Sequence, residues 1–239
     1  MNYTKSEITE IVSKFMSKAN TDNRYRSFDY CYNYFKNTKD LTKDIEKSCL
    51  TLGFYLASWG MYRGSSFILQ KSLYHYKATI IYLNELKKSD PKVWEIDIDK
   101  YDDKNIEKLV DIYNEICGIL VKSNDETKKH RSITLVTKLM LGVFGSVPAF
   151  DEYFIKTFAN IGNCKFKVFN KTALLQIKKF YDDNHKEINS LCNSIKTLDF
   201  LTGEETPINY TKAKIIDMYG FGSSFQDKSK KKKHDQSLT

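Results

Sequence analysis

Apolar residues recur at intervals of three and four along most of the chain, which is the spacing of one face of an α-helix. The first such stripe, over residues 5–18, consists of Ile8, Ile11, Val12 and Phe15. The same spacing predicts helices over residues 27–37, 44–60, 65–88, 105–122 and 132–145. Further helices are expected from about residue 151, after Asn170, over residues 185–198 and within residues 210–219. Strand patterns are scarce, so the predicted fold class is all-α, a multi-helix globular domain.

The predicted organisation is a single domain over residues 1–225. Residues 44–60 are apolar nearly all round, which predicts a buried helix. Residues 89–105 contain Pro91 and many acids, so we expect an exposed connection, and any division into two lobes would fall near residues 88–104. Their acids lack the glycine and the final glutamate of an EF-hand calcium loop. Residues 226–239 carry no apolar stripe and are predicted to form a disordered basic tail.

Composition permits a polyanionic partner without requiring one. The chain has 239 residues, of which 41% are hydrophobic and 14% aromatic, enough for a substantial core. Its formal net charge is +8, and five lysines within residues 228–233 supply most of that excess. The body is therefore only mildly basic, so the charge permits a polyanionic partner, and DNA or another polyanion is the partner we expect.

Several classes of site are not indicated by the sequence. The five cysteines are scattered without a CxxC pair, and the four histidines are far apart, so no metal site is expected. The glycine-rich phosphate loop and the dinucleotide-binding glycine pattern are both missing, so no cofactor is expected. The polar N-terminus and the short apolar runs predict a cytoplasmic protein that does not associate with a membrane.

The segment GVFGSVPAFDEYF, residues 142–154, is the first candidate for chemistry. An apolar helix punctuated by glycine runs into Pro148 and reaches Asp151 at the predicted start of the next helix. Upstream, two predicted helices joined by the polar connector KSNDETKKH form a hairpin that begins near residue 116. An acid at this position either caps the following helix or faces a substrate.

Residues 116–154 resemble the helix-hairpin-helix DNA glycosylases. In that family the hairpin grips the phosphodiester backbone, and an aspartate after a Val-Pro stretch stabilises positive charge on the sugar as the base leaves. The resemblance places Asp151 as the catalytic acid and Lys128, Lys129 and Arg131 on the phosphates. The connector lacks the family's Gly-x-Gly, and Arg131-Ser132 stands where bifunctional members carry a nucleophilic lysine. The resemblance therefore implies a monofunctional hydrolase.

The alternative interpretation of Asp151 is structural. Aspartate is among the preferred helix N-caps, and Pro148 would close the turn before it. The sequence alone leaves both interpretations open.

A second candidate is WGMYRGSSF, residues 59–67. Glycines, an arginine and paired serines before a predicted helix are the ingredients of an anion site, because free backbone N–H groups and a guanidinium both bind phosphate. We therefore expect nucleic-acid contacts from Arg63, Ser65, Ser66 and Lys71, and a base pocket lined by Trp59 and Tyr62. The alternative is an ordinary tight turn between helices.

Together these patterns predict a nucleic-acid-associated helical protein, with a monofunctional DNA glycosylase-like enzyme that cleaves an N-glycosidic bond as the leading hypothesis. A noncatalytic all-α module that binds nucleic acid or protein is the competing hypothesis. In a third, the basic tail alone supplies affinity for polyanions.

Overall fold

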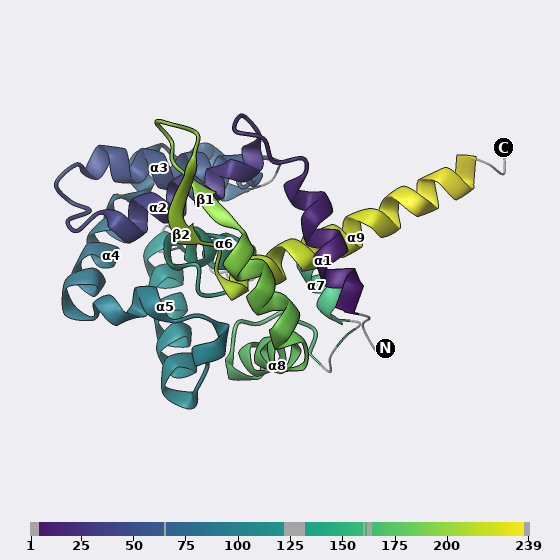
Figure 1. Ribbon diagram of the computed structural model, residues 1–239. Coiled ribbons are helices and arrows are strands. Elements are labelled where there is room, and N and C mark those ends of the chain that lie inside the picture. The colour runs from purple at the N-terminus through teal and green to yellow at the C-terminus, as the bar shows by residue number, and fades with distance from the viewer. Residues whose placement is uncertain (1–4, 65, 122–131, 160, 162–163, 237–239) are drawn as a thin grey trace.

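The computed structural model describes residues 5–64, 66–121, 132–159, 161 and 164–236. Within these residues the chain is mostly helical, as predicted, with one short two-stranded hairpin (Figure 1). The α-helices are α1 Lys5–Met16, α2 Ser27–Asn37, α3 Ile45–Ser58, α4 Lys77–Ser89, α5 Asp103–Val121, α6 Ser132–Phe144, α7 Glu152–Ala159, α8 Lys171–Ser194 and α9 Lys212–Gln236. The antiparallel strands are β1 Lys196–Leu198 and β2 Glu205–Asn209.

Helix α6 lies at the centre of the fold. Residues 135–150, which cover most of α6 and the turn that follows it, are all buried. The helix packs against α2, α3 and α5, as expected for a segment that is apolar on every side. Gly142 lets α6 pack closely against α3, because a Cβ at this position would lie only 2.3 Å from the ring of Tyr55 on α3. The Tyr55 hydroxyl then donates to the backbone oxygen of Lys138 at 3.0 Å.

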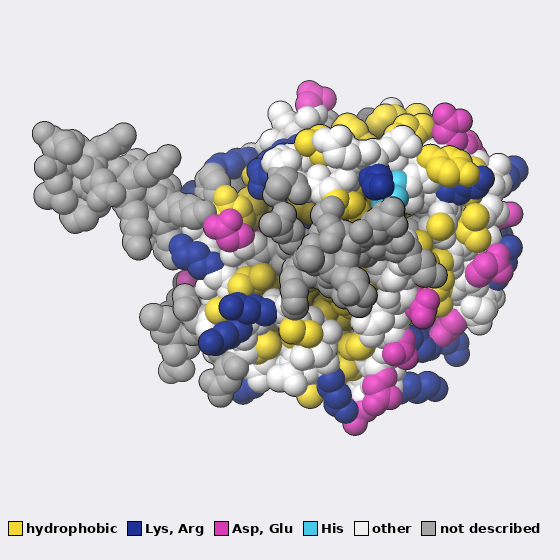
Figure 2. Space-filling model, turned by 180° about the vertical axis from the view of Figure 1, so that it is seen from behind, with side chains coloured by type: hydrophobic (Ala, Val, Ile, Leu, Met, Phe, Trp, Pro, Cys, Tyr) yellow, Lys and Arg dark blue, Asp and Glu magenta, His cyan; other side chains and the backbone are white. Residues whose placement is uncertain are grey.

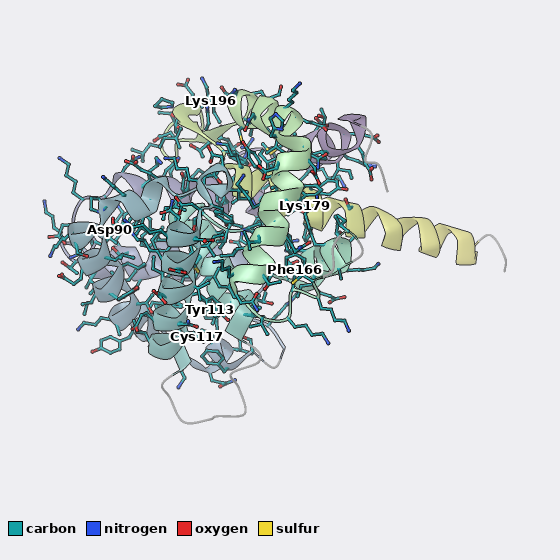
Figure 3. All side chains as sticks on the ribbon, turned by 90° about the horizontal axis from the view of Figure 1, so that it is seen from below. Asp90, Tyr113, Cys117, Phe166, Lys179 and Lys196 are labelled. Atoms are coloured by element: carbon teal, nitrogen blue, oxygen red, sulfur yellow. The ribbon has the colours of Figure 1, made fainter. Side chains whose placement is uncertain are left out.

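Helix α9 is the second helix around which several others pack. Its first part packs against α1, α7 and α8, and its C-terminal part projects from the body (Figure 1). Aromatic rings fill the space around α7, where Phe154 stacks on Phe158 at 4.3 Å between ring centroids. The segment between α7 and α8 contributes Phe166, which is labelled in Figure 3. Its ring lies edge-on to Phe154 at 5.6 Å between centroids. Rings therefore supply much of the contact between α7 and its neighbours.

The expected exposed connection at residues 89–105 is wrong. This segment forms two short 3-10 helices, Pro91–Glu95 and Ile98–Lys100, and buries Val93, Trp94, Ile96, Ile98 and Tyr101. The carboxylate of Asp97 accepts hydrogen bonds from the backbone nitrogens of Lys212 and Ala213 at 2.8 and 3.0 Å. The segment therefore joins the N-terminus of α9 to the core.

Three other boundaries differ from those predicted. The single helix over residues 65–88 is replaced by 3-10 helices Phe67–Gln70 and Leu73–Tyr76 followed by α4, because Ser66 and Ser72 have extended backbones. Helix α8 is kinked at Asn184, next to the predicted start of a separate helix. The β-branched residues after α8 pair as the β1–β2 hairpin.

Helix α9 is also longer than predicted. The backbone of residues 226–236 is helical where a disordered tail was expected. The sequence there contains no proline or glycine to end the helix.

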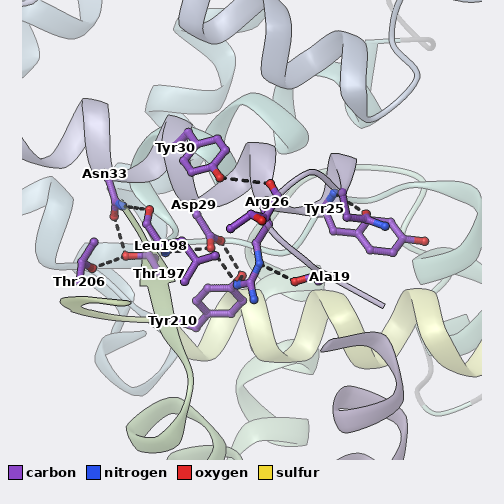
Figure 4. Close-up of polar contacts among 12 residues, drawn as sticks. Ala19, Tyr25, Arg26, Asp29, Tyr30, Asn33, Thr197, Leu198, Thr206 and Tyr210 are labelled. Carbon is purple, nitrogen blue, oxygen red and sulfur yellow. Dashed lines mark hydrogen bonds and ion pairs between the residues drawn. The ribbon is translucent and has the colours of Figure 1, made fainter. Parts of the chain in front are cut away.

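Asp29 on α2 anchors the hairpin to the helical core (Figure 4). Its buried carboxylate accepts hydrogen bonds from the Tyr210 hydroxyl at 2.5 Å and from the Leu198 backbone nitrogen at 3.0 Å. Arg26 completes the set with an ion pair at 3.0 Å. Burial raises the pKa of Asp29, while Tyr210 and Arg26 act to lower it. One carboxylate therefore holds both ends of the hairpin, at Leu198 and Tyr210, to α2.

We expect Asp29→Ala to lower the free energy of unfolding by about 3–5 kcal/mol, because it leaves the Arg26 charge and the Leu198 amide without their partner. Asp22→Ala is the matched control: Asp22 is exposed, and its removal should change stability by less than about 0.5 kcal/mol. Urea denaturation followed by circular dichroism measures both. Equal stabilities for the two variants would contradict the anchoring role of Asp29.

Candidate functional site

Asp151 sits at the N-terminus of α7 and caps it. Its Oδ1 accepts hydrogen bonds from the backbone nitrogens of Tyr153 and Phe154, both at 3.0 Å. Asp151 is therefore a helix N-cap, which was the structural interpretation of this residue. Because only one carboxylate oxygen is occupied by the cap, the geometry leaves Oδ2 for another partner.

The turn before Asp151 is held from two sides. The Thr137 hydroxyl accepts a hydrogen bond from the Phe150 backbone nitrogen at 2.9 Å, and Asp217 on α9 accepts one from the Ala149 nitrogen at 3.1 Å. Gly145 begins the turn with a φ of +65°, and a side chain there would approach Tyr32 to 2.8 Å. The position of the carboxylate is thus fixed by α6 and α9 together.

The partner of Oδ2 is Lys138, in the interior of α6. The Lys138 ammonium lies 3.3 Å from Asp151 Oδ2, and the two side chains are only 7% and 14% exposed. The same ammonium donates to the backbone oxygen of Trp59 at 3.1 Å. Burial raises the pKa of Asp151, Lys138 lowers it, and the charge of Asp217 raises it further.

A second buried ion pair lies beside the first. Lys214 and Asp217 on α9 form an ion pair at 2.9 Å, with side chains 2% and 9% exposed. The Lys214 ammonium lies 4.6 Å from the centroid of the Trp59 ring, and the Lys138 ammonium lies 5.6 Å from it. We call these five residues the Trp59 cluster: Trp59, Lys138, Asp151, Lys214 and Asp217.

Aromatic rings extend the cluster toward the surface. Tyr25 stacks on the partly buried Trp59 at 5.5 Å between centroids, and Phe221 meets Trp59 edge-on at 6.3 Å. The Arg24 guanidinium lies 5.3 Å from the Tyr25 ring and is exposed. The arrangement combines a partly exposed carboxylate of raised pKa, two ammonium groups and a stack of flat rings. Such a combination is typical of functional sites that stabilise charge.

Trp59 and Asp151, predicted in two separate segments, lie in the same cluster. Tyr62 lies near it in sequence, but its hydroxyl donates to Tyr76 at 2.9 Å. Arg63 is exposed, and its guanidinium carbon would lie 3.1 Å from a Cβ at Gly60.

The predicted anion site lacks the helix on which it depended. Ser66 precedes a four-residue 3-10 helix and makes no side-chain cap, so the expected N-terminus of a long helix is wrong. Lys71 is partly buried. Burial and the positive charge of Lys71 lower the pKa of His75. The predicted phosphate contacts Ser65, Lys128, Lys129 and Arg131 lie outside the described residues.

Sequence reasoning missed three members of the cluster. Lys138 is the single charged residue in the apolar helix SITLVTKLMLGVF, a signal that could have identified it. Lys214 and Asp217 stand three apart in an otherwise apolar stretch of α9, the spacing of neighbours on one helix face. Only the folded chain shows that these groups surround Trp59.

Other kinds of site find no support in the part of the chain that the structure describes. No group of three or more His, Cys, Asp or Glu side chains there could hold a metal ion. None of the helices there is long and apolar enough to cross a membrane. On the face in Figure 2, the coloured Lys and Arg side chains are interspersed with Asp and Glu.

Comparisons with known proteins do not assign the site. No protein-family model, curated protein or solved structure matches the chain. The chemistry of the site is therefore inferred from the geometry of the Trp59 cluster.

Proposed function

We propose that the protein binds nucleic acid and acts as a monofunctional DNA glycosylase-like enzyme, with Asp151 as its catalytic carboxylate. One observation carries the proposal: Lys138 bridges Trp59 and Asp151, which come from the two segments selected independently on sequence. The exposed Arg24 lies 5.3 Å from the Tyr25 ring, and the exposed Arg63 lies against Gly60, the residue after Trp59. Both guanidinium groups are of the kind that binds phosphates around an unstacked base.

The chemistry follows from the charges. Cleavage of an N-glycosidic bond leaves the bonding electron pair on the base and builds positive charge on the sugar. A fixed carboxylate beside that sugar lowers the energy of the transition state, and the two N–H groups on Oδ1 hold Asp151 in one orientation. Lys138 favours the ionised carboxylate despite its burial.

A noncatalytic binding module is the second candidate. It is favoured by the fact that Asp151 already has a complete set of structural partners, the α7 cap and Lys138. In that case the carboxylate would serve stability alone, and Tyr25, Trp59 and the arginines would bind without catalysis.

The first test is release of free base from duplex and single-stranded DNA carrying a panel of modified bases. We expect wild type to release at least one base and Asp151→Asn to lose about 100-fold or more of that rate, because the carboxylate's charge is gone while its shape remains. Asp151→Asn also leaves Lys138 unpaired, so the double variant Asp151→Asn with Lys138→Gln, which removes both charges, controls for stability.

Chemical analysis of released bases, DNA affinity and melting temperature are measured for the same preparations. Wild type that binds DNA but releases no base from any substrate would contradict the enzyme and support the binding module. Base release at the wild-type rate by the folded double variant would exclude Asp151 as the catalytic group.

The pH dependence of base release gives an independent test. Release needs ionised Asp151, so the rate should fall as pH decreases through a pKa above the ordinary value of 3.8. Asp217→Asn removes a neighbouring negative charge and should move this acid limb to lower pH. Lys138→Met removes the positive partner and should move it to higher pH. Identical acid limbs in all three proteins would contradict the assignment.

The tail should contribute to nonspecific affinity. Deleting residues 226–239 removes the five lysines of residues 228–233, which are able to displace counterions from DNA. We expect weaker binding and a salt dependence, as log K against log salt, that is shallower by up to about 4–5, since each phosphate contact contributes about 0.9. Melting temperature should change little, because the segment lacks an apolar stripe. An unchanged slope would show that the tail makes no contact.

A further inference from the structure

An open groove of about 510 Å³ lies between α2, α3 and the tip of the β1–β2 hairpin. It is separate from the Trp59 cluster and shares no residue with it. We call it the hairpin groove and define it by six of the residues that line it: Tyr30, Tyr34, Lys47, Phe54, Phe200 and Leu201.

The apolar side chains that line the hairpin groove are unusually exposed to solvent. Phe54 is 68% exposed, Phe200 is 74% exposed and Leu201 is 89% exposed. Helix α3 was expected to be buried all round, but Phe54 and Leu50, which is 47% exposed, lie on an outward face. Clustered exposed apolar side chains on separate elements mark an interaction surface rather than a core.

The groove is preformed. The β1 backbone at Leu198 is held by Asp29 and by Asn33, whose amide nitrogen donates to the Leu198 oxygen at 3.0 Å (Figure 4). Asp199 then folds the hairpin turn by accepting hydrogen bonds from the Leu201 and Thr202 nitrogens at 2.9 and 3.0 Å. Because these bonds hold the backbone that carries Phe200 and Leu201, binding does not have to pay the entropy of ordering that backbone.

The charges of the groove specify the chemistry of that occupant. Lys47 and Asp199 are the charged residues of its lining, and the Asp199 carboxylate is occupied by the turn. Lys47 lies 5.8 Å from the Tyr34 ring, and in the described part of the chain it forms no ion pair. Ser27 also lines the groove, and its buried hydroxyl has no hydrogen-bond partner among the described residues. An occupant should therefore be apolar and carry an acid for Lys47.

We propose that the hairpin groove binds a short apolar peptide segment of a partner protein, with an aromatic or leucine side chain between Phe54 and Phe200 and a carboxylate on Lys47. A nucleic acid fits less well, because the flanking segments mix both signs: Lys36, Lys39, Lys43, Asp40, Asp44, Glu46, Glu204 and Glu205. Added-strand pairing is also disfavoured, since Pro207 interrupts the hydrogen-bond donors of β2.

The test uses the full chain and a phage-displayed library of short random peptides. Peptides are selected on wild type after depletion on Phe54→Ser, a change at a side chain so exposed that folding should be retained. Enriched peptides should share apolar anchors and an Asp or Glu. Their affinity, measured by fluorescence polarisation, should fall about tenfold or more in Phe54→Ser and in Phe200→Ser. Tyr74→Ser is the matched control, since Tyr74 is 72% exposed outside the groove lining, and it should bind like wild type.

A charge exchange tests the role of Lys47. Lys47→Glu should weaken binding of the selected acidic peptides, and replacing their acid by lysine should restore it. The proposal is overturned if no peptide is enriched, or if enriched peptides bind Phe54→Ser as tightly as wild type. It is also overturned if Phe54→Ser abolishes self-association in sedimentation, which would make the occupant a second copy. Loss of oligothymidine binding in Phe54→Ser would instead assign the groove to nucleic acid.

Discussion

Two adjacent buried ion pairs determine how this fold is held together. Lys138 with Asp151 joins α6 to the start of α7, and Lys138 also donates a hydrogen bond to the backbone oxygen of Trp59. Lys214 with Asp217 lies within α9, and Asp217 ties α9 to the turn before α7 by accepting a hydrogen bond from the Ala149 nitrogen. Burying a charge is costly unless it is paired and hydrogen-bonded. Each of these four groups therefore requires its partner, and both ammonium groups lie within about 6 Å of the centroid of the Trp59 ring.

The same constraint makes Asp151 suited to chemistry. One carboxylate oxygen is fixed by the α7 cap, the other faces Lys138, and the side chain keeps 14% of its surface exposed. Burial and the nearby Asp217 charge raise its pKa, so the group is held in a defined orientation with an altered affinity for protons. A structural cap and a catalytic carboxylate are compatible roles, since the cap supplies the rigidity that catalysis needs.

Periodicity predicted what local spacing can decide. The stripe over residues 27–37 matches α2 from Ser27 to Asn37, and Asp151 lies at the head of α7 as predicted. Prediction from local sequence failed where burial in the folded chain overrides local composition. The acids around Trp94 suggested an exposed loop, yet Trp94 is 6% exposed and Asp97 holds α9. The ion pair of Lys138 was missed because its partner Asp151 is defined only when α6 and α7 pack together. Lys214 and Asp217 are neighbours on one helix face, but only the folded chain places Lys214 beside Trp59.

In the proposed function, Asp151 stabilises positive charge on a sugar. The most direct measurement compares the affinity of the protein for two DNA duplexes that differ only at one abasic position, a cationic pyrrolidine or a neutral tetrahydrofuran. We expect wild type to bind the pyrrolidine duplex more tightly, by about 100-fold or more, and Asp151→Asn to lose this preference. Equal affinity of wild type for the two duplexes, or a preference that persists in Asp151→Asn, would contradict this role of Asp151.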